Sequence, residues 1–106
     1  MKHIAVITTV GNIDDARRIA RDLVERRLVA CAHISEIESV YVWKGALEND
    51  KEFRVLLKTT AARYDEVERA IKATHPYELP AIYATSLERV YAPYAEWLEA
   101  NSSTGS

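Results

Sequence analysis

His75-Pro76-Tyr77-Glu78-Leu79-Pro80 separates the last two long elements of this 106-residue chain. Two prolines four positions apart cannot lie within a regular helix, and each one pushes the preceding residue toward extended backbone. The stretch therefore predicts a stiff link that leaves the end of a helix and enters a strand. Such a link holds the His75 imidazole, the Tyr77 phenol and the Glu78 carboxylate in fixed positions. The alternative is a plain helix-to-strand connection with ordinary polar residues.

The elements on either side of this link are predicted from hydrophobic periodicity. Before it, residues 61–74 have helical spacing, with Thr60 as the expected N-cap. After it, residues 81–87 alternate apolar and polar side chains and predict a strand. Pro93 suits the first turn of a last short helix.

The N-terminal half predicts a strand, a helix and a long hairpin. Residues 4–9 form a β-branched apolar run, and residues 13–27 have helical spacing after the expected N-cap Asn12. Residues 29–43 alternate as a strand, except that Ile37 breaks the alternation and predicts a bulge or bend. Turn chemistry at residues 44–45 and 48–50 precedes a second strand, residues 52–60, so the two strands are expected to form an antiparallel hairpin.

This βαββαβ order with a short C-terminal helix predicts an α+β, ferredoxin-like split βαβ fold. We expect one domain, residues 1–100, whose antiparallel sheet carries the helices on one face, followed by a disordered polar tail, residues 101–106. The alternation places an apolar and aromatic set on or near the other face: Tyr41, Trp43, Leu56 and Tyr83. Because a monomer rarely exposes such a surface, we expect self-association through it.

Composition excludes several classes of protein. The formal net charge is −2 and no Lys/Arg block is present, so no nucleic-acid partner is expected. No apolar run approaches the length of a membrane-spanning helix, and no signal peptide is visible, so no membrane partner is expected. A single cysteine cannot form an internal disulfide. These features predict a cytoplasmic protein.

Metal ligation has few candidates. Cys31 and His33 are two positions apart on a predicted strand and point to one face, and a thiolate and an imidazole suit copper or zinc. His75 is the other candidate, because its loop fixes it. No compact set of four ligands is present. The alternative for Cys31, between two alanines, is a small buried residue.

A small-ligand cleft is the second candidate site. Lys58 and Thr59 end a strand, and the split βαβ order allows them to meet the link that carries His75, Tyr77 and Glu78 near a sheet end or subunit junction. Lys58 would then bind an anion, with hydroxyls from Thr8, Thr9 or Thr59 adding hydrogen bonds. The alternative is a structural Lys58–Glu78 ion pair. No nucleophile–base pair, phosphate loop or paired carboxylates predict an enzyme.

Five short motifs together resemble one family: Ala30-Cys31-Ala32, Tyr41-Val42-Trp43-Lys44-Gly45, Leu57-Lys58-Thr59-Thr60, the 75–80 link, and Tyr94-Ala95-Glu96-Trp97-Leu98. Their order and spacing over residues 4–100 are similar to those of the divalent-cation tolerance protein family, CutA. The resemblance implies a ferredoxin-like fold, a homotrimer, and a role in the response to divalent metals, copper above all. It also implies likeness to PII signalling proteins, which bind small effectors between subunits.

The chain differs from some family members at three places. Thr8 stands where some members have a thiol, Thr74 where some have a second histidine, and Ser35-Glu36 where many have Pro-Gly. Two functional hypotheses follow from the resemblance and the residues. One is a trimeric protein that binds copper or zinc through His75 and Cys31. The other is a PII-like trimer that binds a small anionic effector in inter-subunit clefts.

Overall fold

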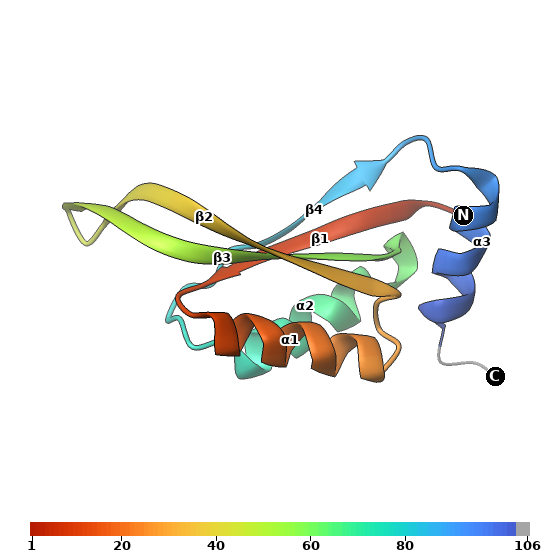
Figure 1. Ribbon diagram of the computed structural model, residues 1–106, viewed down its shortest axis with the longest axis horizontal. Helices are drawn as coiled ribbons and strands as arrows, with labels where there is room; N and C mark the ends of the chain where they lie inside the picture. Colours follow the sequence, from red (N-terminus) through yellow and green to blue (C-terminus); the bar gives the residue numbers. More distant parts are fainter. Residues whose placement is uncertain (104–106) are drawn as a thin grey trace.

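The computed structural model describes residues 1–103 as one four-stranded antiparallel sheet with two helices on one face (Figure 1). The strand order in the sheet is β2-β3-β1-β4. The predicted α+β ferredoxin-like fold is confirmed. The elements in chain order are β1 (His3–Val10), α1 (Ile13–Glu25), β2 (Cys31–Trp43), β3 (Ala46–Thr60), the 3-10 turn η1 (Ala61–Arg63), α2 (Tyr64–Thr74), β4 (Ile82–Leu87) and α3 (Ala92–Asn101).

The hydrophobic core lies between the sheet and the two helices α1 and α2. Alternate residues of β1 and β3 point toward the helices, and the apolar stripes of α1 and α2 meet them. No helix of residues 1–103 has the length and apolar character needed to cross a membrane. The side chains at the centre of the core are almost fully buried: Val6, Val10, Ile19, Leu23, Val55, Leu57, Val67 and Ile71.

Helix α1 begins as predicted and ends two residues early. The Asn12 side chain accepts a hydrogen bond from the Asp15 N–H at 2.8 Å. Arg27 has a φ of 57°, a left-handed conformation that a helix cannot continue. Its guanidinium donates to the Ala100 carbonyl at 2.6 Å, so Arg27 anchors the end of α3 instead of closing α1.

The hairpin of β2 and β3 extends well beyond the helices (Figure 1). Its register is continuous, and Ile37 pairs directly with Glu52, so the predicted bulge is wrong, while the alternative of a bend stays a prediction. The two-residue turn Lys44-Gly45 has φ values of 51° and 82°, which fit the twist of a tight hairpin. Because this turn is so short, β3 begins at Ala46 rather than at 52. Residues 48–50 therefore belong to the ladder and not to a turn.

Thr60 does not cap α2. It is the last residue of the β3 ladder, where it pairs with His3, and its side chain makes no capping hydrogen bond. The η1 turn separates it from α2, which begins at Tyr64 instead of at 61. The predicted cap is wrong because strand pairing continues to this residue.

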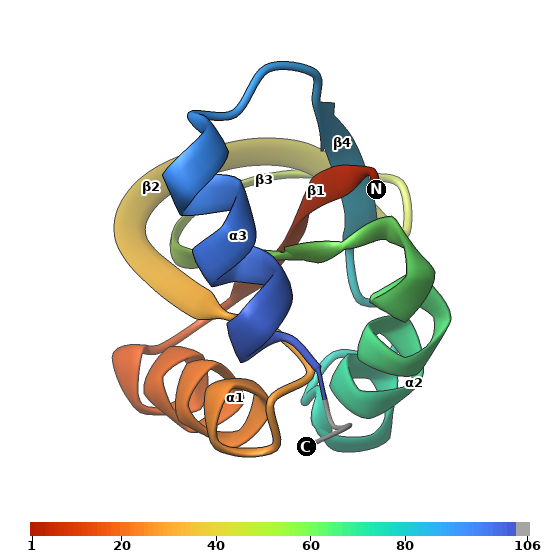
Figure 2. The same ribbon diagram turned by 90° about the vertical axis from the view of Figure 1, so that its right-hand side faces the viewer.

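Helix α3 crosses one end of the sheet, on the side from which the N-terminus enters (Figure 2). Pro93 lies in its first turn as predicted, and Leu98 is fully buried. Asn101 is the last residue of α3, and Ser102 is buried with its hydroxyl donating to the Leu98 carbonyl. The predicted disorder is therefore wrong for Asn101 and Ser102. Residues 104–106 of the predicted tail lie outside the described residues.

The face of the sheet without helices carries the predicted aromatic set. Ile7 pairs with both Leu56 and Tyr83, and directly opposed side chains share a face. Tyr41 and Trp43 have the matching parity on β2. Tyr83 remains 52% exposed in the single chain, and Tyr41 and Trp43 are also exposed. These side chains therefore lie on the face without helices, as predicted.

Candidate functional site

The side chains singled out in the sequence form two separate groups in the structure. The first group surrounds the link between α2 and β4, next to the C-terminal end of β1. The second group lies on the helix-free face near α3, beside the opposite end of β1. The distance between the groups decides which of the predicted contacts exist within one chain.

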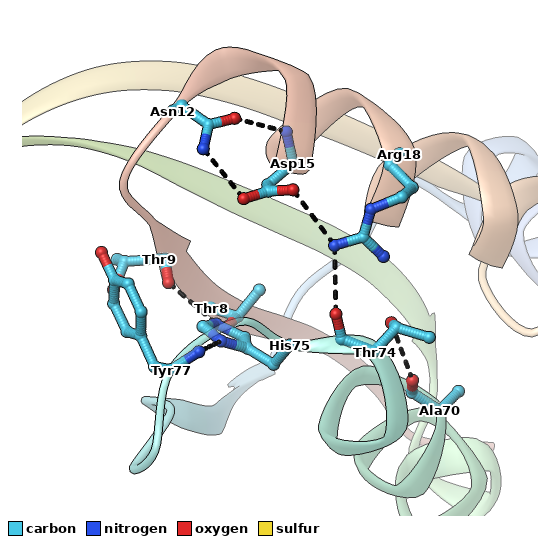
Figure 3. A network of polar contacts seen from close by, with 9 residues as sticks. All are labelled: Thr8, Thr9, Asn12, Asp15, Arg18, Ala70, Thr74, His75 and Tyr77. Atoms are coloured by element: carbon cyan, nitrogen blue, oxygen red, sulfur yellow. Dashed lines mark hydrogen bonds and ion pairs between the residues drawn. The ribbon is translucent and has the colours of Figure 1, made fainter.

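His75 fastens the link to β1 (Figure 3). Its Nε2 lies 2.9 Å from the Thr9 carbonyl oxygen and 3.1 Å from the Thr8 hydroxyl. Its Nδ1 accepts a hydrogen bond from the Tyr77 N–H at 3.1 Å. Pro76 prevents helical backbone at His75, whose ψ of 135° turns the chain out of α2. The prolines therefore place the imidazole where both ring nitrogens have partners.

These partners define the protonation state of His75. A carbonyl acceptor at Nε2 and an N–H donor at Nδ1 require a neutral ring with its proton on Nε2. Burial lowers the pKa of His75 below 6.5, although the Thr9 carbonyl, with Asp15 and Glu52, opposes this change. Neither ring nitrogen retains a free lone pair for a metal ion in this arrangement. His75 thus acts as an anchor of the link.

The neighbouring polar network supports the same link (Figure 3). Arg18 of α1 forms an ion pair with Asp15 and donates to the Thr74 carbonyl at 3.0 Å. This bond satisfies a carbonyl at the end of α2 that has no partner within the helix. Thr74 itself donates its hydroxyl to the Ala70 carbonyl at 3.4 Å. Thr74, which stands where some family members have a second histidine, therefore has its hydrogen-bond partner within the helix.

Tyr77 connects the link to the hairpin. Its hydroxyl donates to Glu52 of β3 at 2.6 Å, and Glu52 is only 7% exposed. Burial, followed by the hydrogen bond and charge of Glu52, raises the pKa of Tyr77. A Cβ at position 11 would lie 3.3 Å from the Tyr77 hydroxyl, so Gly11 leaves room for this side chain.

A cleft of about 810 Å³ opens between the hairpin and the link on the helix-free side. Most of its wall is aromatic or apolar, and its polar groups include a hydroxyl from Thr9 and several carboxylates. Such a concave, largely apolar surface with few polar groups is typical of small-ligand sites. The residues that line it from the hairpin and from the link and β4 include Tyr41, Trp43, Asp50, Glu52, Tyr77, Glu78 and Tyr83.

Glu78 does not pair with Lys58. Its carboxylate lies 3.7 Å from the Lys44 ammonium at the tip of the hairpin, and both side chains are exposed. The same ammonium lies 5.7 Å from the centre of the Trp43 ring. An exposed pair of this kind contributes at most about 1 kcal/mol to stability. The predicted Lys58–Glu78 ion pair is therefore not formed within the chain.

The second group centres on Cys31 and Tyr94. The Cys31 sulfur lies 3.8 Å from His33 Nε2 and 3.5 Å from the Tyr94 hydroxyl. Lys58, the cross-strand neighbour of Cys31, donates to the same hydroxyl at 3.4 Å. The hydrogen bond with Cys31, together with burial, raises the pKa of Tyr94, whereas Lys58 lowers it. Cys31 and His33 do share a face as predicted, and the Cys31 side chain is only partly buried.

Lys58 and Thr59 are separated from the His75 link. Lys58 pairs with Ala5, three residues along β1 from Thr8 and so about 10 Å away. Thr59 points to the opposite face, where it is fully buried and its hydroxyl donates to the Leu28 carbonyl at 2.8 Å. The anion site predicted from these residues is not assembled within one chain.

Comparison with known proteins identifies the family. The sequence pattern described as CutA1 divalent ion tolerance protein matches residues 4–101. This chain belongs to that family. It is 41% identical, over 90% of its length, to the divalent-cation tolerance protein CutA of Thermotoga maritima, and 37% identical, over 92%, to that of Thermococcus kodakarensis. It covers 94% of each of these relatives.

Solved structures of CutA proteins have the same fold. The structure described as the periplasmic divalent cation tolerance protein CutA from Archaeoglobus fulgidus superposes with a TM-score of 0.93 at 33% identity. The match covers 95% of this chain and 99% of that one. The resemblance inferred from the five motifs is confirmed.

The spacing of Cys31 and His33 bears on metal binding in this CutA1-family chain. Among residues 1–103, no three or more His, Cys, Asp or Glu side chains gather in a way that could hold a metal. With metal–sulfur and metal–nitrogen bonds of about 2.3 and 2.0 Å, however, donors 3.8 Å apart subtend an angle of about 120° at a shared ion. The separation of Cys31 and His33 is therefore compatible with both side chains binding one ion.

Sequence reasoning did not identify Asp50 and Glu52 as cleft residues of this CutA1-family chain. Turn chemistry at residues 48–50 predicts a turn for Asp50, and the sequence pattern predicts only the start of a strand for Glu52. The parity of Glu52 with Leu56 and Lys58 does place it on the helix-free face. Its contact with Tyr77 joins residues 25 positions apart and has no local signal.

Proposed function

We propose that this chain forms a cytoplasmic homotrimer that binds divalent metal ions, copper above all, and contributes to tolerance of them without being an enzyme. The observation that carries the proposal is the 3.8 Å separation of Cys31 Sγ and His33 Nε2 on an accessible strand surface. A thiolate and an imidazole suit copper and zinc, and divalent copper binds such ligands more tightly than zinc does. The names of the relatives support a role in divalent-cation tolerance.

His33 replaces His75 as the proposed histidine ligand. Both nitrogens of His75 are engaged by backbone and hydroxyl partners, whereas His33 is exposed beside the only thiol of the chain. Two protein donors leave coordination positions for water or for a second copy. A trimer supplies further copies of the pair, which supports linking metal binding to assembly.

The cytoplasmic location rests on the single cysteine, which gives no sign of disulfide chemistry. The Archaeoglobus relative is described as periplasmic, so the location needs a direct measurement. Fractionation of cells that express the full chain, with marker proteins for each compartment, distinguishes the two locations.

Metal titration tests the proposed ligands. We expect calorimetry with Cu(II), and with redox-inactive Zn(II) as comparison, to show binding to the wild-type chain. Loss of either donor in Cys31→Ser or His33→Asn is expected to weaken binding about tenfold or more, because each removes one of two protein ligands. His75→Ala is the matched control and is expected to retain the wild-type affinity. Equal affinity in all four proteins contradicts the proposed pair, and loss in His75→Ala alone moves the site to the link.

The second candidate function is a PII-like trimer that binds a small anionic effector between subunits. One observation favours it: within residues 1–103, Lys58 has no carboxylate within ion-pair distance and donates only to Tyr94. Thermal-shift screening with anionic metabolites, on wild type and Lys58→Met, tests this alternative. Stabilisation of wild type that disappears in Lys58→Met supports it, and no stabilisation removes it.

A further inference from the structure

The hydroxyl of Tyr94 lies beside the proposed Cys31–His33 pair. It comes from α3, which crosses the end of the sheet at which β2 begins (Figure 2). The Tyr94 oxygen lies 3.5 Å from the Cys31 sulfur, and His33 Nε2 lies 3.8 Å from the same atom. A sulfur, a nitrogen and an oxygen donor therefore meet around Cys31. The proposed metal site uses only the first two of them.

Both distances from the Cys31 sulfur suit bonds to one metal ion. Zinc binds sulfur at about 2.3 Å and nitrogen or oxygen at about 2.0 Å, in a tetrahedral arrangement. With these bond lengths, donors 3.5 Å apart subtend an angle of about 110° at the ion, and donors 3.8 Å apart subtend about 120°. Both angles are close to tetrahedral. The fourth position is left for water or for a donor of another copy.

The contacts of Tyr94 hold its ring in this position. The ring stacks on Trp97, with centroids 5.7 Å apart and an interplanar angle of 12°. Lys58 Nζ lies 5.4 Å from the centre of the Tyr94 ring and donates to the hydroxyl at 3.4 Å. A side chain that is oriented in advance loses less conformational freedom when it binds an ion. Lys58 can keep its hydrogen bond when the oxygen binds a metal, as the outer partners of metal ligands do.

We propose that Tyr94 is a third protein ligand of the metal site, through its phenol oxygen. The assignment rests on the proposed metal binding by Cys31 and His33. A bound divalent ion takes the place of the thiol proton of Cys31 and the phenol proton of Tyr94, which pass to solvent, and with zinc no electron is transferred. The two negative charges that result reduce the repulsion between the ion and the ammonium of Lys58.

The third ligand sets a preference among metal ions. Soft sulfur donors select monovalent copper, whereas a set that also contains nitrogen and oxygen suits borderline divalent ions. Without the oxygen of Tyr94, the sulfur and nitrogen that remain would hold a soft monovalent ion equally well. Tyr94 is therefore expected to strengthen the binding of divalent ions specifically.

Titration calorimetry with Zn(II) and Ag(I), on the assembled full-length protein, tests this assignment. Ag(I) stands in for monovalent copper, because it is soft, stable in air and satisfied by two donors. Tyr94→Phe keeps the ring that stacks on Trp97 and removes only the oxygen. We expect its Zn(II) affinity to be weaker than that of wild type by about tenfold or more, and its Ag(I) affinity to stay within about twofold. Tyr91→Phe, which removes an exposed tyrosine hydroxyl from the residue before α3, is the matched control and is expected to leave both affinities unchanged.

Near-ultraviolet difference spectra report on the phenol itself. Coordination removes the phenol proton, which shifts the absorption of tyrosine to longer wavelength, and zinc does not absorb there. Addition of Zn(II) is expected to produce this difference band in wild type and in Tyr91→Phe. The band is expected to be absent in Tyr94→Phe.

Each failure has its own signature. Equal Zn(II) affinity of wild type and Tyr94→Phe, or no tyrosine difference band, overturns the assignment; if Cys31→Ser still weakens binding, the two-donor site stands without Tyr94. Equal loss of Zn(II) and Ag(I) affinity in Tyr94→Phe overturns it as well, because the hydroxyl then only supports the structure around Cys31. Absence of Zn(II) binding to wild type removes the proposed metal site and this assignment with it.

Discussion

Val42→Asp is expected to convert the proposed trimer into monomers. Val42 and its cross-strand partner Leu47 are 69% and 75% exposed near the tip of the projecting hairpin. Trp43 and Tyr41 occupy the other face of the same hairpin, so apolar side chains are present on both faces. A charge buried without a partner at an interface costs several kcal/mol, and a trimer repeats that cost three times.

Light scattering after gel filtration measures this change directly. The wild-type chain is expected at about three times its mass of 12.0 kDa, and Val42→Asp at about that mass. Because Val42 is exposed in the single chain, the substitution should leave the fold of each monomer intact, which circular dichroism checks. Val42→Thr keeps the branched shape without a charge and is expected to remain trimeric.

The assembly proposal fails on either of two results. A wild-type mass near 12.0 kDa at micromolar concentration shows that no trimer forms. A trimeric Val42→Asp protein shows that the hairpin tip is not in the interface. Val24→Asp, on the exposed side of α1, serves as the control for a charge introduced elsewhere and is expected to stay trimeric.

The fold was predictable because its signals are local and repeated. A β-branched apolar run identified β1, two-residue alternation identified the other strands, and helical spacing before the 75–80 link identified α2. The register of the hairpin was predicted less well. Ile37 breaks the alternation of apolar and polar side chains, but the backbone pairing of β2 with β3 continues through it. Glu52 opposite Ile37 shows that a polar residue can occupy a continuous ladder.

The candidate site was predictable only in part. The stiffness of the link followed from its prolines, and the shared face of Cys31 and His33 followed from their spacing. Lys58 and His75 do not meet within one chain, because the register of β1 with β3 separates them along the sheet; their meeting at a subunit junction stays a prediction. The sequence also contains no signal that both nitrogens of His75 would be satisfied by Thr9 and Tyr77, because these contacts depend on the tertiary path of the link.

Replacement of His75 by phenylalanine is expected to lower the free energy of unfolding by about 2–4 kcal/mol. The variant keeps a ring in the link but removes the hydrogen bonds to Thr8, Thr9 and Tyr77. The Thr8 hydroxyl is fully buried, so the loss of a partner there is costly. Urea unfolding of wild type and His75→Phe at about pH 7.5, with trimer concentration held constant, measures the difference.

The pH dependence of that difference tests the role of His75 as a neutral anchor. Its pKa in the folded protein lies below 6.5, chiefly because of burial, so the unfolded chain binds the proton more tightly. The stabilisation by His75 is therefore complete above about pH 6.5 and decreases as the pH falls through 6.5 toward the lowered pKa. Wild type is expected to lose its advantage over His75→Phe as the pH falls below about 6.5. A difference that stays constant or grows as the pH falls would show that the charged imidazole stabilises the link, contrary to the hydrogen bonds observed.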